Sequence, residues 1–106
     1  MHILAAIALA TAIASQTSAH GCVGFDGTWQ GPGGTMHLRN GSGDYGETVL
    51  KGKVTGKVLR GTWRHPTVGK GTFLFILAPD GDSFTTTWRN SSGRSGSFDT
   101  VNCVSP

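Results

Sequence analysis

The chain has 106 residues, enough for one small domain. Nine Lys and Arg against six Asp and Glu give a net charge of +3, a basic balance too weak to argue for a nucleic-acid partner. All 17 Gly follow residue 20 and no stretch keeps a helical period, so a helical domain is excluded and an antiparallel all-β domain is predicted.

The first 19 residues have the pattern of a secretory signal peptide. Residues 3–14 are apolar and small, and a short polar stretch then ends in Ala19. A bilayer span needs about 20 apolar residues, so no membrane span is expected. Cleavage after Ala14 and cleavage after Ala19 both fit, and we favour Ala19, which leaves residues 20–106 as a single all-β domain. The protein is therefore expected to be secreted or periplasmic.

The two Cys, Cys22 and Cys103, bracket this domain. In an exported chain they are expected to form one disulfide that joins the two ends. A zinc pair or a catalytic thiol is the alternative.

Short alternating runs between turn residues predict seven strands. Asn40-Gly41 is a strong hairpin-turn dipeptide, and Asp44, Asp80 and Asp82 are placed in turns, where Asp is common. Residues 71–78 are apolar on both faces, so their strand should be the most buried. The expected strands span residues 25–30, 35–40, 48–54, 57–64, 71–78, 83–89 and 97–103.

Consecutive hairpins tend to be neighbours, so these strands should form an up-and-down meander. A meander of this size curls on itself or leaves its edges open. The predicted fold is a small coiled antiparallel meander or barrel, with its closure left open. Exposed first and last strands would allow either a monomer or an edge-strand dimer.

Each of the three Trp ends the same five-residue pattern: an apolar residue, any residue, Gly or Thr, Thr, and then Trp. On a strand, the apolar residue, the Gly or Thr and the Trp face the same way. The pattern therefore either builds the core or lines a cleft for a small apolar or sugar ligand. Candidate cleft residues are Trp29, Trp63 and Trp88.

These runs resemble those of small secreted bacterial β-meander domains. More distantly, Gly27-x-Trp29 is similar to the first-strand motif of the calycins, which include lipocalins, avidins and periplasmic metalloprotease inhibitors. The chain is far shorter than a lipocalin, and the polar biotin contacts of avidins have no counterpart here. The resemblance implies non-catalytic binding of a small molecule or a protein and does not identify the ligand.

Two further constellations are candidates for function. If cleavage follows Ala19, the new amino terminus and imidazole of His20, completed by His37 or His65, form a nitrogen set suited to copper. Basic side chains on outward positions could also share one wall, or they could simply form a solvated face. This basic set comprises Arg39, Lys51, Lys53, Lys57, Arg60, Arg64 and Arg89.

No nucleophile motif and no phosphate-binding Gly-rich loop is present, so no enzymatic activity and no resident cofactor are expected. The favoured hypothesis is a secreted, non-enzymatic protein that binds a small apolar molecule, a glycan or a partner protein. One alternative is copper binding through His20. Another is an inhibitor or effector that acts through the basic outer face.

Overall fold

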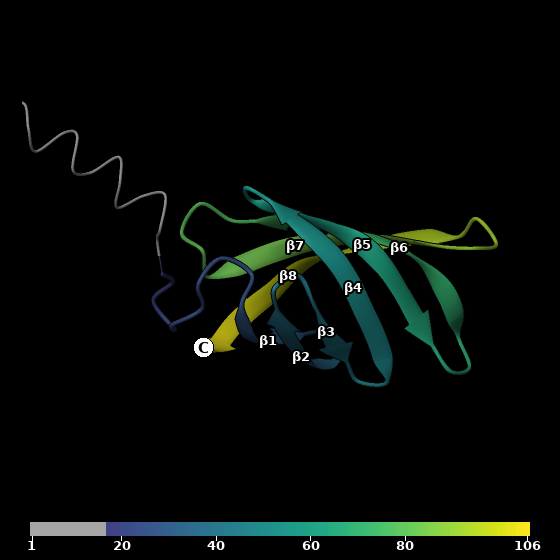
Figure 1. Cartoon of the computed structure of the whole chain (residues 1–106), viewed down its shortest axis with the longest axis horizontal. Helices are drawn as coiled ribbons and strands as arrows, with labels where there is room; N and C mark the ends of the chain where they lie inside the picture. Colours follow the sequence, from purple (N-terminus) through teal and green to yellow (C-terminus); the bar gives the residue numbers. More distant parts are fainter. Residues whose placement is uncertain (1–16) are drawn as a thin grey trace, which may run out of the picture.

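A computed structural model of the chain describes residues 17–106, apart from the side chains of Asp99 and Thr100. The apolar run at residues 3–14 lies outside the described residues. Residues 17–106 form eight antiparallel strands in the order of the sequence (Figure 1). The strands are β1 (Gly27–Gly31), β2 (Gly34–Arg39), β3 (Ser42–Tyr45), β4 (Thr48–Thr55), β5 (Val58–His65), β6 (Gly69–Leu77), β7 (Ser83–Asn90) and β8 (Ser95–Ser105). The predicted all-β meander is confirmed.

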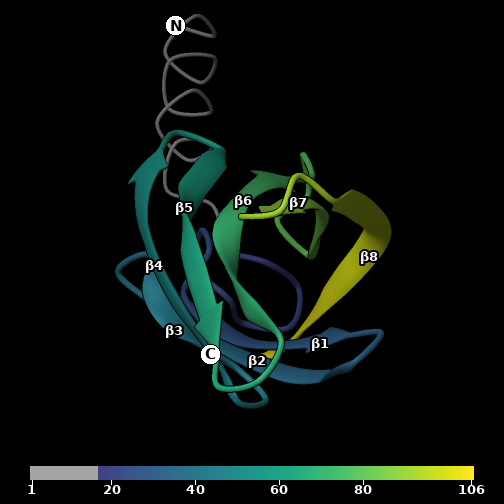
Figure 2. The ribbon, with the colours of Figure 1, turned by 90° about the vertical axis from the view of Figure 1, so that its right-hand side faces the viewer.

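The sheet closes into a barrel because β1 pairs with β8 (Figure 2). Thr28 lies opposite Ser105, and Gln30 lies opposite Asn102. Closure removes the premise of the edge-strand dimer, because the first and last strands occupy each other's edges.

The sequence prediction missed β3. Asn40 and Gly41 both have positive φ, 53° and 82°, and make the tight turn expected of this dipeptide. The chain then pairs with β2 at once, so Asp44 is a strand residue opposite His37, and its placement in a turn was wrong. Ser, Gly and Asp are uncommon in strands. These residues therefore form a strand because of the turn before them and the register that it sets, and not because of their own strand propensity.

One end of the barrel is filled by its own side chains. The ring of Phe84 packs edge-on against Trp29 and stacks on Phe75, with both pairs of ring centroids 4.7 Å apart. The Trp29 indole is fully buried and donates a hydrogen bond to the carbonyl oxygen of Phe25 at 2.9 Å. This packed end holds the core and excludes ligand.

Burial on β6 differs from the expectation. Phe73 and Phe75 are buried, but Leu74 is half-buried and Ile76 is 47% exposed. In a closed barrel only one face of each strand looks inward, so a strand that is apolar on both faces must leave one of them outside.

The predicted disulfide is confirmed between Cys22 and Cys103, whose Cα atoms lie 6.2 Å apart. It adjoins the closing seam, because Cys103 lies opposite Trp29 where β8 pairs with β1. Such a bond is compatible with an oxidising extracellular or periplasmic location. Ser18 is also buried beside it, and its hydroxyl accepts a hydrogen bond from the Cys22 amide at 3.0 Å. Cleavage after Ala14 would keep this contact and cleavage after Ala19 would remove it.

Removing the disulfide in a Cys22→Ala, Cys103→Ala variant should lower the free energy of unfolding by roughly 4 kcal/mol, because the bond restricts a long loop in the unfolded chain. Urea unfolding of the oxidised protein and of the variant, followed by far-ultraviolet circular dichroism, measures the difference. Equal midpoints would show that β1–β8 pairing needs no covalent support.

Candidate functional site

The three Trp patterns all face the barrel interior, as the alternation predicts. Within each pattern, the first, apolar residue is buried and the residue that follows it is more exposed. Trp29 belongs to the packed end, whereas Trp63 and Trp88 are half-buried at the opposite end and contact each other edge-on, with centroids 6.4 Å apart. The same pattern therefore builds core at one end of the barrel and a partly open site at the other.

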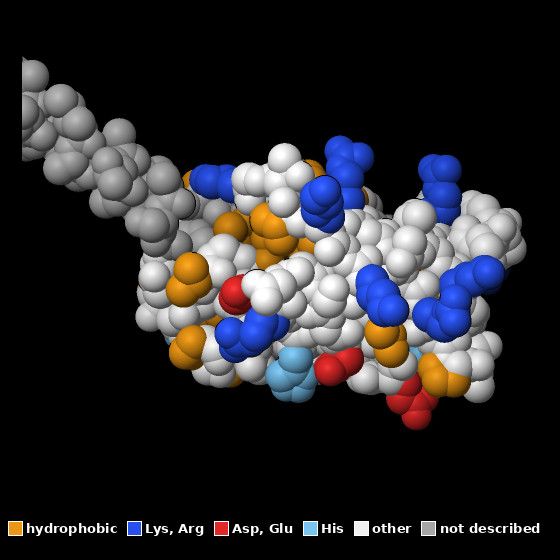
Figure 3. Space-filling model, viewed as in Figure 1, with side chains coloured by type: hydrophobic (Ala, Val, Ile, Leu, Met, Phe, Trp, Pro, Cys, Tyr) orange, Lys and Arg blue, Asp and Glu red, His pale blue; other side chains and the backbone are white. Residues whose placement is uncertain are grey.

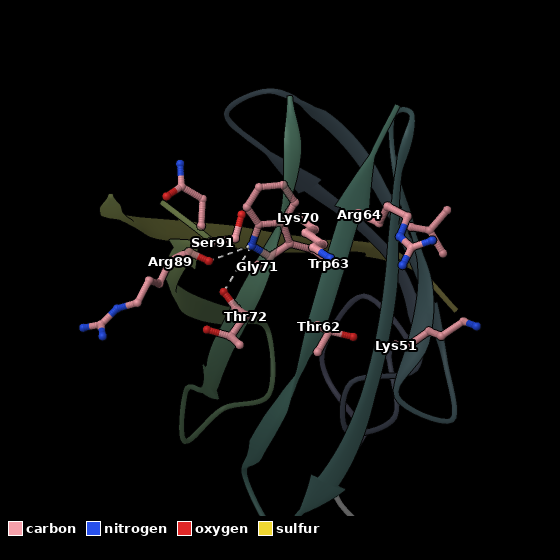
Figure 4. Close-up of a pocket in the computed structure, with 11 residues that line it drawn as sticks. Lys51, Thr62, Trp63, Arg64, Lys70, Gly71, Thr72, Arg89 and Ser91 are labelled. Atoms are coloured by element: carbon pink, nitrogen blue, oxygen red, sulfur yellow. Dashed lines mark hydrogen bonds between the residues drawn. The ribbon is translucent and has the colours of Figure 1, made fainter. Parts of the chain in front are cut away.

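Each of these two Trp lies over a glycine on the next strand. Trp63 is the register partner of Gly71, and Trp88 is the partner of Gly96. A Cβ added at Gly71 would lie 2.7 Å from the Trp63 indole nitrogen, and one at Gly96 would lie 2.7 Å from the Trp88 ring. The Trp63 indole also donates to the carbonyl oxygens of Thr72 and Arg89, at 3.2 and 3.3 Å (Figure 4). The rings are therefore held in fixed positions by their neighbours.

A cavity of about 180 Å³ lies beside these rings. Tyr45 of β3 and Phe98 of β8 complete its wall and contact each other with centroids 6.4 Å apart. The strands β1, β2 and β3 have five, six and four residues, whereas the other strands have eight to eleven. The barrel wall is therefore shorter along the barrel axis where these three strands form it. The full lining is Met36, Tyr45, Thr48, Leu50, Trp63, Phe73, Phe75, Thr86, Trp88 and Phe98.

One buried hydroxyl in this apolar wall has no partner. Thr86 is 3% exposed, and its Oγ1 makes no hydrogen bond among the described residues. Leaving a buried hydroxyl unpaired costs about 1–3 kcal/mol. Its neighbours on the cavity wall offer mainly carbon atoms, so a partner for this oxygen has to enter through the mouth.

Sequence reasoning placed Thr86 inward but did not mark it as a ligand contact. The signal available was a Thr on the buried face of a strand, between Phe84 and Trp88. Tyr45 was missed together with its strand. Phe98 was missed because β8 shifts register across the stretch that pairs with Phe84 and Thr86, which hides its alternation.

The predicted basic set divides between different parts of the surface. Lys51, Lys53, Arg60, Arg64 and Arg89 lie on outward positions of β4, β5 and β7, which are neighbours through β6. Lys70 on β6 belongs with them and was not predicted. Arg39 lies on β2, and Lys57 lies in the turn between β4 and β5. The set of five plus Lys70 is called the basic face below.

The three candidate metal ligands lie apart, each against its own carboxylate. The His20 Nδ1 lies 3.1 Å from both Asp82 oxygens, and the His37 Nδ1 lies 2.9 Å from Asp44. His65 Nε2 lies 3.6 Å from Glu47. Within residues 17–106 no group of three His, Cys, Asp or Glu could hold a metal ion. Copper binding through His20 stays a prediction.

Comparison with protein-family models, with curated proteins and with solved structures finds no match to this chain. In the part of the chain that the structure describes, no helix is long and apolar enough to cross a membrane. Function is therefore inferred from the chain's own residues.

The contact between His20 and Asp82 should make the stability depend on pH. The hydrogen bond from His20 holds the pKa of the Asp82 carboxyl below its ordinary value. A carboxyl with a lowered pKa adds stability above its unfolded pKa, about 3.9 for Asp, and loses that contribution as the pH falls through the folded value. We therefore expect Asp82→Asn to flatten the fall in melting temperature below about pH 4.

A series of thermal unfolding curves at acid pH measures this effect. The control is His20→Ala, which should flatten the same part of the curve, and the double variant should add nothing to either single one. Parallel pH curves for the wild type and Asp82→Asn would contradict the assignment.

Proposed function

We propose that this protein is a non-enzymatic binding protein whose barrel mouth takes a small, mainly apolar ring compound with one hydrogen-bonding group. A dry cavity of about 150 Å³ is enough for benzene, and the cavity here measures about 180 Å³. Its mainly aromatic and aliphatic lining, with the hydroxyls of Tyr45, Thr48 and Thr86, has the composition of a ligand pocket. Eight-stranded barrels are wide enough for one small ligand.

The observation that carries this proposal is the unpaired hydroxyl of Thr86. A core position with no other purpose would favour Val, which has the same shape and needs no hydrogen bond. A ligand hydroxyl or carbonyl that reaches Oγ1 satisfies the buried group, while its ring packs against Trp63 and Trp88. The cost of the unpaired hydroxyl in the empty protein then becomes part of the affinity and specificity for the ligand.

Among the three ligand classes expected from the sequence, this site favours the small molecule. A glycan presents many hydroxyl groups, and burying them here would leave most without partners. A protein segment would need a larger opening than the cavity provides. The resemblance of Gly27-x-Trp29 to calycin first strands agrees with this proposal, since those barrels also bind ligands at one end.

Phenol and toluene test the proposal because both are single rings and only phenol carries a hydrogen-bonding group. We expect phenol to change the Trp fluorescence and to raise the melting temperature with concentration. In Thr86→Val the phenol affinity should fall up to about tenfold, as one lost hydrogen bond implies, while toluene affinity stays unchanged. The ligand-free variant should be more stable by about 1 kcal/mol, because it lacks the unpaired hydroxyl.

Thr85→Val is the matched control, because Thr85 neighbours Thr86 on β7 and faces solvent. It should leave the binding of both compounds unchanged. The proposal is wrong if neither compound binds the wild type, or if Thr86→Val and Thr85→Val weaken phenol binding equally.

A further inference from the structure

The outer surface of four neighbouring strands carries charge of one sign. Strands β4, β5, β6 and β7 hold six of the nine Lys and Arg and none of the six Asp and Glu. The acidic residues lie in the turns, on β3, on β8 and before β1. In Figure 3 separate Lys and Arg patches stand out over the molecule, while most of the acidic side chains in view lie at its lower margin.

Within this basic face the cations are not neutralised by the protein. Lys53 is the direct cross-strand partner of Arg60, and Arg64 is the partner of Lys70. Like charges in directly opposed positions destabilise a sheet. Among the side chains that the structure describes, which leave out Asp99, every salt bridge has a His as its cation and none joins these Lys or Arg to a carboxylate. Negative groups of a bound partner would therefore relieve the repulsion between these cations.

The face is hollowed into a groove of about 640 Å³. One register row crosses it from Lys51 through Thr62 and Thr72 to Arg89. Figure 4 shows Lys51 and Arg89 at opposite margins with the two Thr between them. The next row supplies Arg64 and Lys70. The floor therefore offers hydroxyl groups, and the margins offer positive charge.

A second hollow continues the groove toward β8. It shares Thr72 and Arg89 with the first and reaches Ser95 and Ser97. From β4 to β8 the path crosses four strand spacings, about 19 Å at about 4.8 Å each. This length suits an extended chain with repeated anionic groups rather than a single small anion.

We propose that the basic face binds an acidic polysaccharide, laid across the strands from β4 toward β8. Carboxylate or sulfate groups would meet the Lys and Arg at the margins. Sugar hydroxyls would bond to the Thr and Ser along the floor, and the indole edge of Trp63 adds an apolar contact. The Lys, Arg, Thr and Ser of this site lie on the opposite face of the sheet from the cavity, and the two sites share the rings of Trp63, Phe73 and Trp88. The proposal does not depend on the proposed small ligand.

Two other polyanions fit the groove less well. Single-stranded nucleic acid is bound by stacking successive bases on several exposed aromatic rings. The rings along this path are Trp63 in the first hollow and Phe73 and Trp88 in the second. Phe73 is buried, and the two indoles are held in place by their neighbours, so they offer edges rather than open faces for stacking. An anionic membrane presents a flat surface, which would meet the rim of a hollow but not its floor of Thr62 and Thr72. Both are outcomes of the test below.

Binding of dextran sulfate and polygalacturonate should be measured by titration calorimetry, with uncharged dextran of matched length as the reference. Single-stranded DNA and phosphatidylserine vesicles are titrated in parallel. We expect both acidic polysaccharides to bind, dextran to fail, and the affinity to fall steeply between about 50 and about 200 mM salt. Arg64→Glu with Lys70→Glu should weaken binding by about tenfold or more.

Arg39→Glu with Lys57→Glu is the matched control, since it changes the net charge equally and lies off the basic face. It should weaken binding no more than about twofold. Circular dichroism and melting temperature check that both double variants fold. Equal losses in the two variants, or binding of DNA or vesicles but not of polysaccharide, would overturn the proposal, and Thr86→Val should have no effect here.

Discussion

The pairing of β1 with β8 is the constraint on which the rest of the structure depends. It turns an up-and-down sheet into a barrel, and the Cys22–Cys103 disulfide fixes it at one point. Because the three strands β1 to β3 are short, the wall can enclose the interior fully at only one end. That end fills with Phe25, Trp29 and Phe84, and the other keeps a cavity. The division into core and site therefore follows from closure of the barrel together with the short strands β1 to β3.

Strand alternation then assigns each face a separate chemistry. On β5, the inward Trp63 borders the cavity, while its neighbours Thr62 and Arg64 face outward on the basic face. Trp63 and Trp88 stay at fixed positions because glycine stands opposite each of them. A substitution of a residue that lines only one site, such as Thr86 or Lys70, should thus leave the other site nearly unchanged. This separation allows the two proposed ligands to be tested independently.

The sequence was a good guide wherever a local pattern was strong. Alternation placed the three Trp and Thr86 inward, and turn chemistry placed Asn40-Gly41. The two Cys, which bracket a domain expected to be exported, predicted the disulfide. Sequence reasoning failed where tertiary structure overrode the local signal. The Ser-Gly-Asp-Tyr stretch is a strand only because the preceding turn returns it to β2, and Ile76 is exposed because closure leaves one face of β6 outside. The open cavity depends on relative strand lengths, which no single stretch reveals.

We propose that the barrel mouth is a ligand site rather than a packing defect. A crystal of the protein soaked with 4-bromophenol tests it most directly, since bromine can be located by its anomalous scattering. We expect a bromine peak inside the cavity beside Trp63 and Trp88, with the phenol oxygen within hydrogen-bond distance of Thr86 Oγ1. An empty cavity, or bromine only on the outer surface, would contradict it.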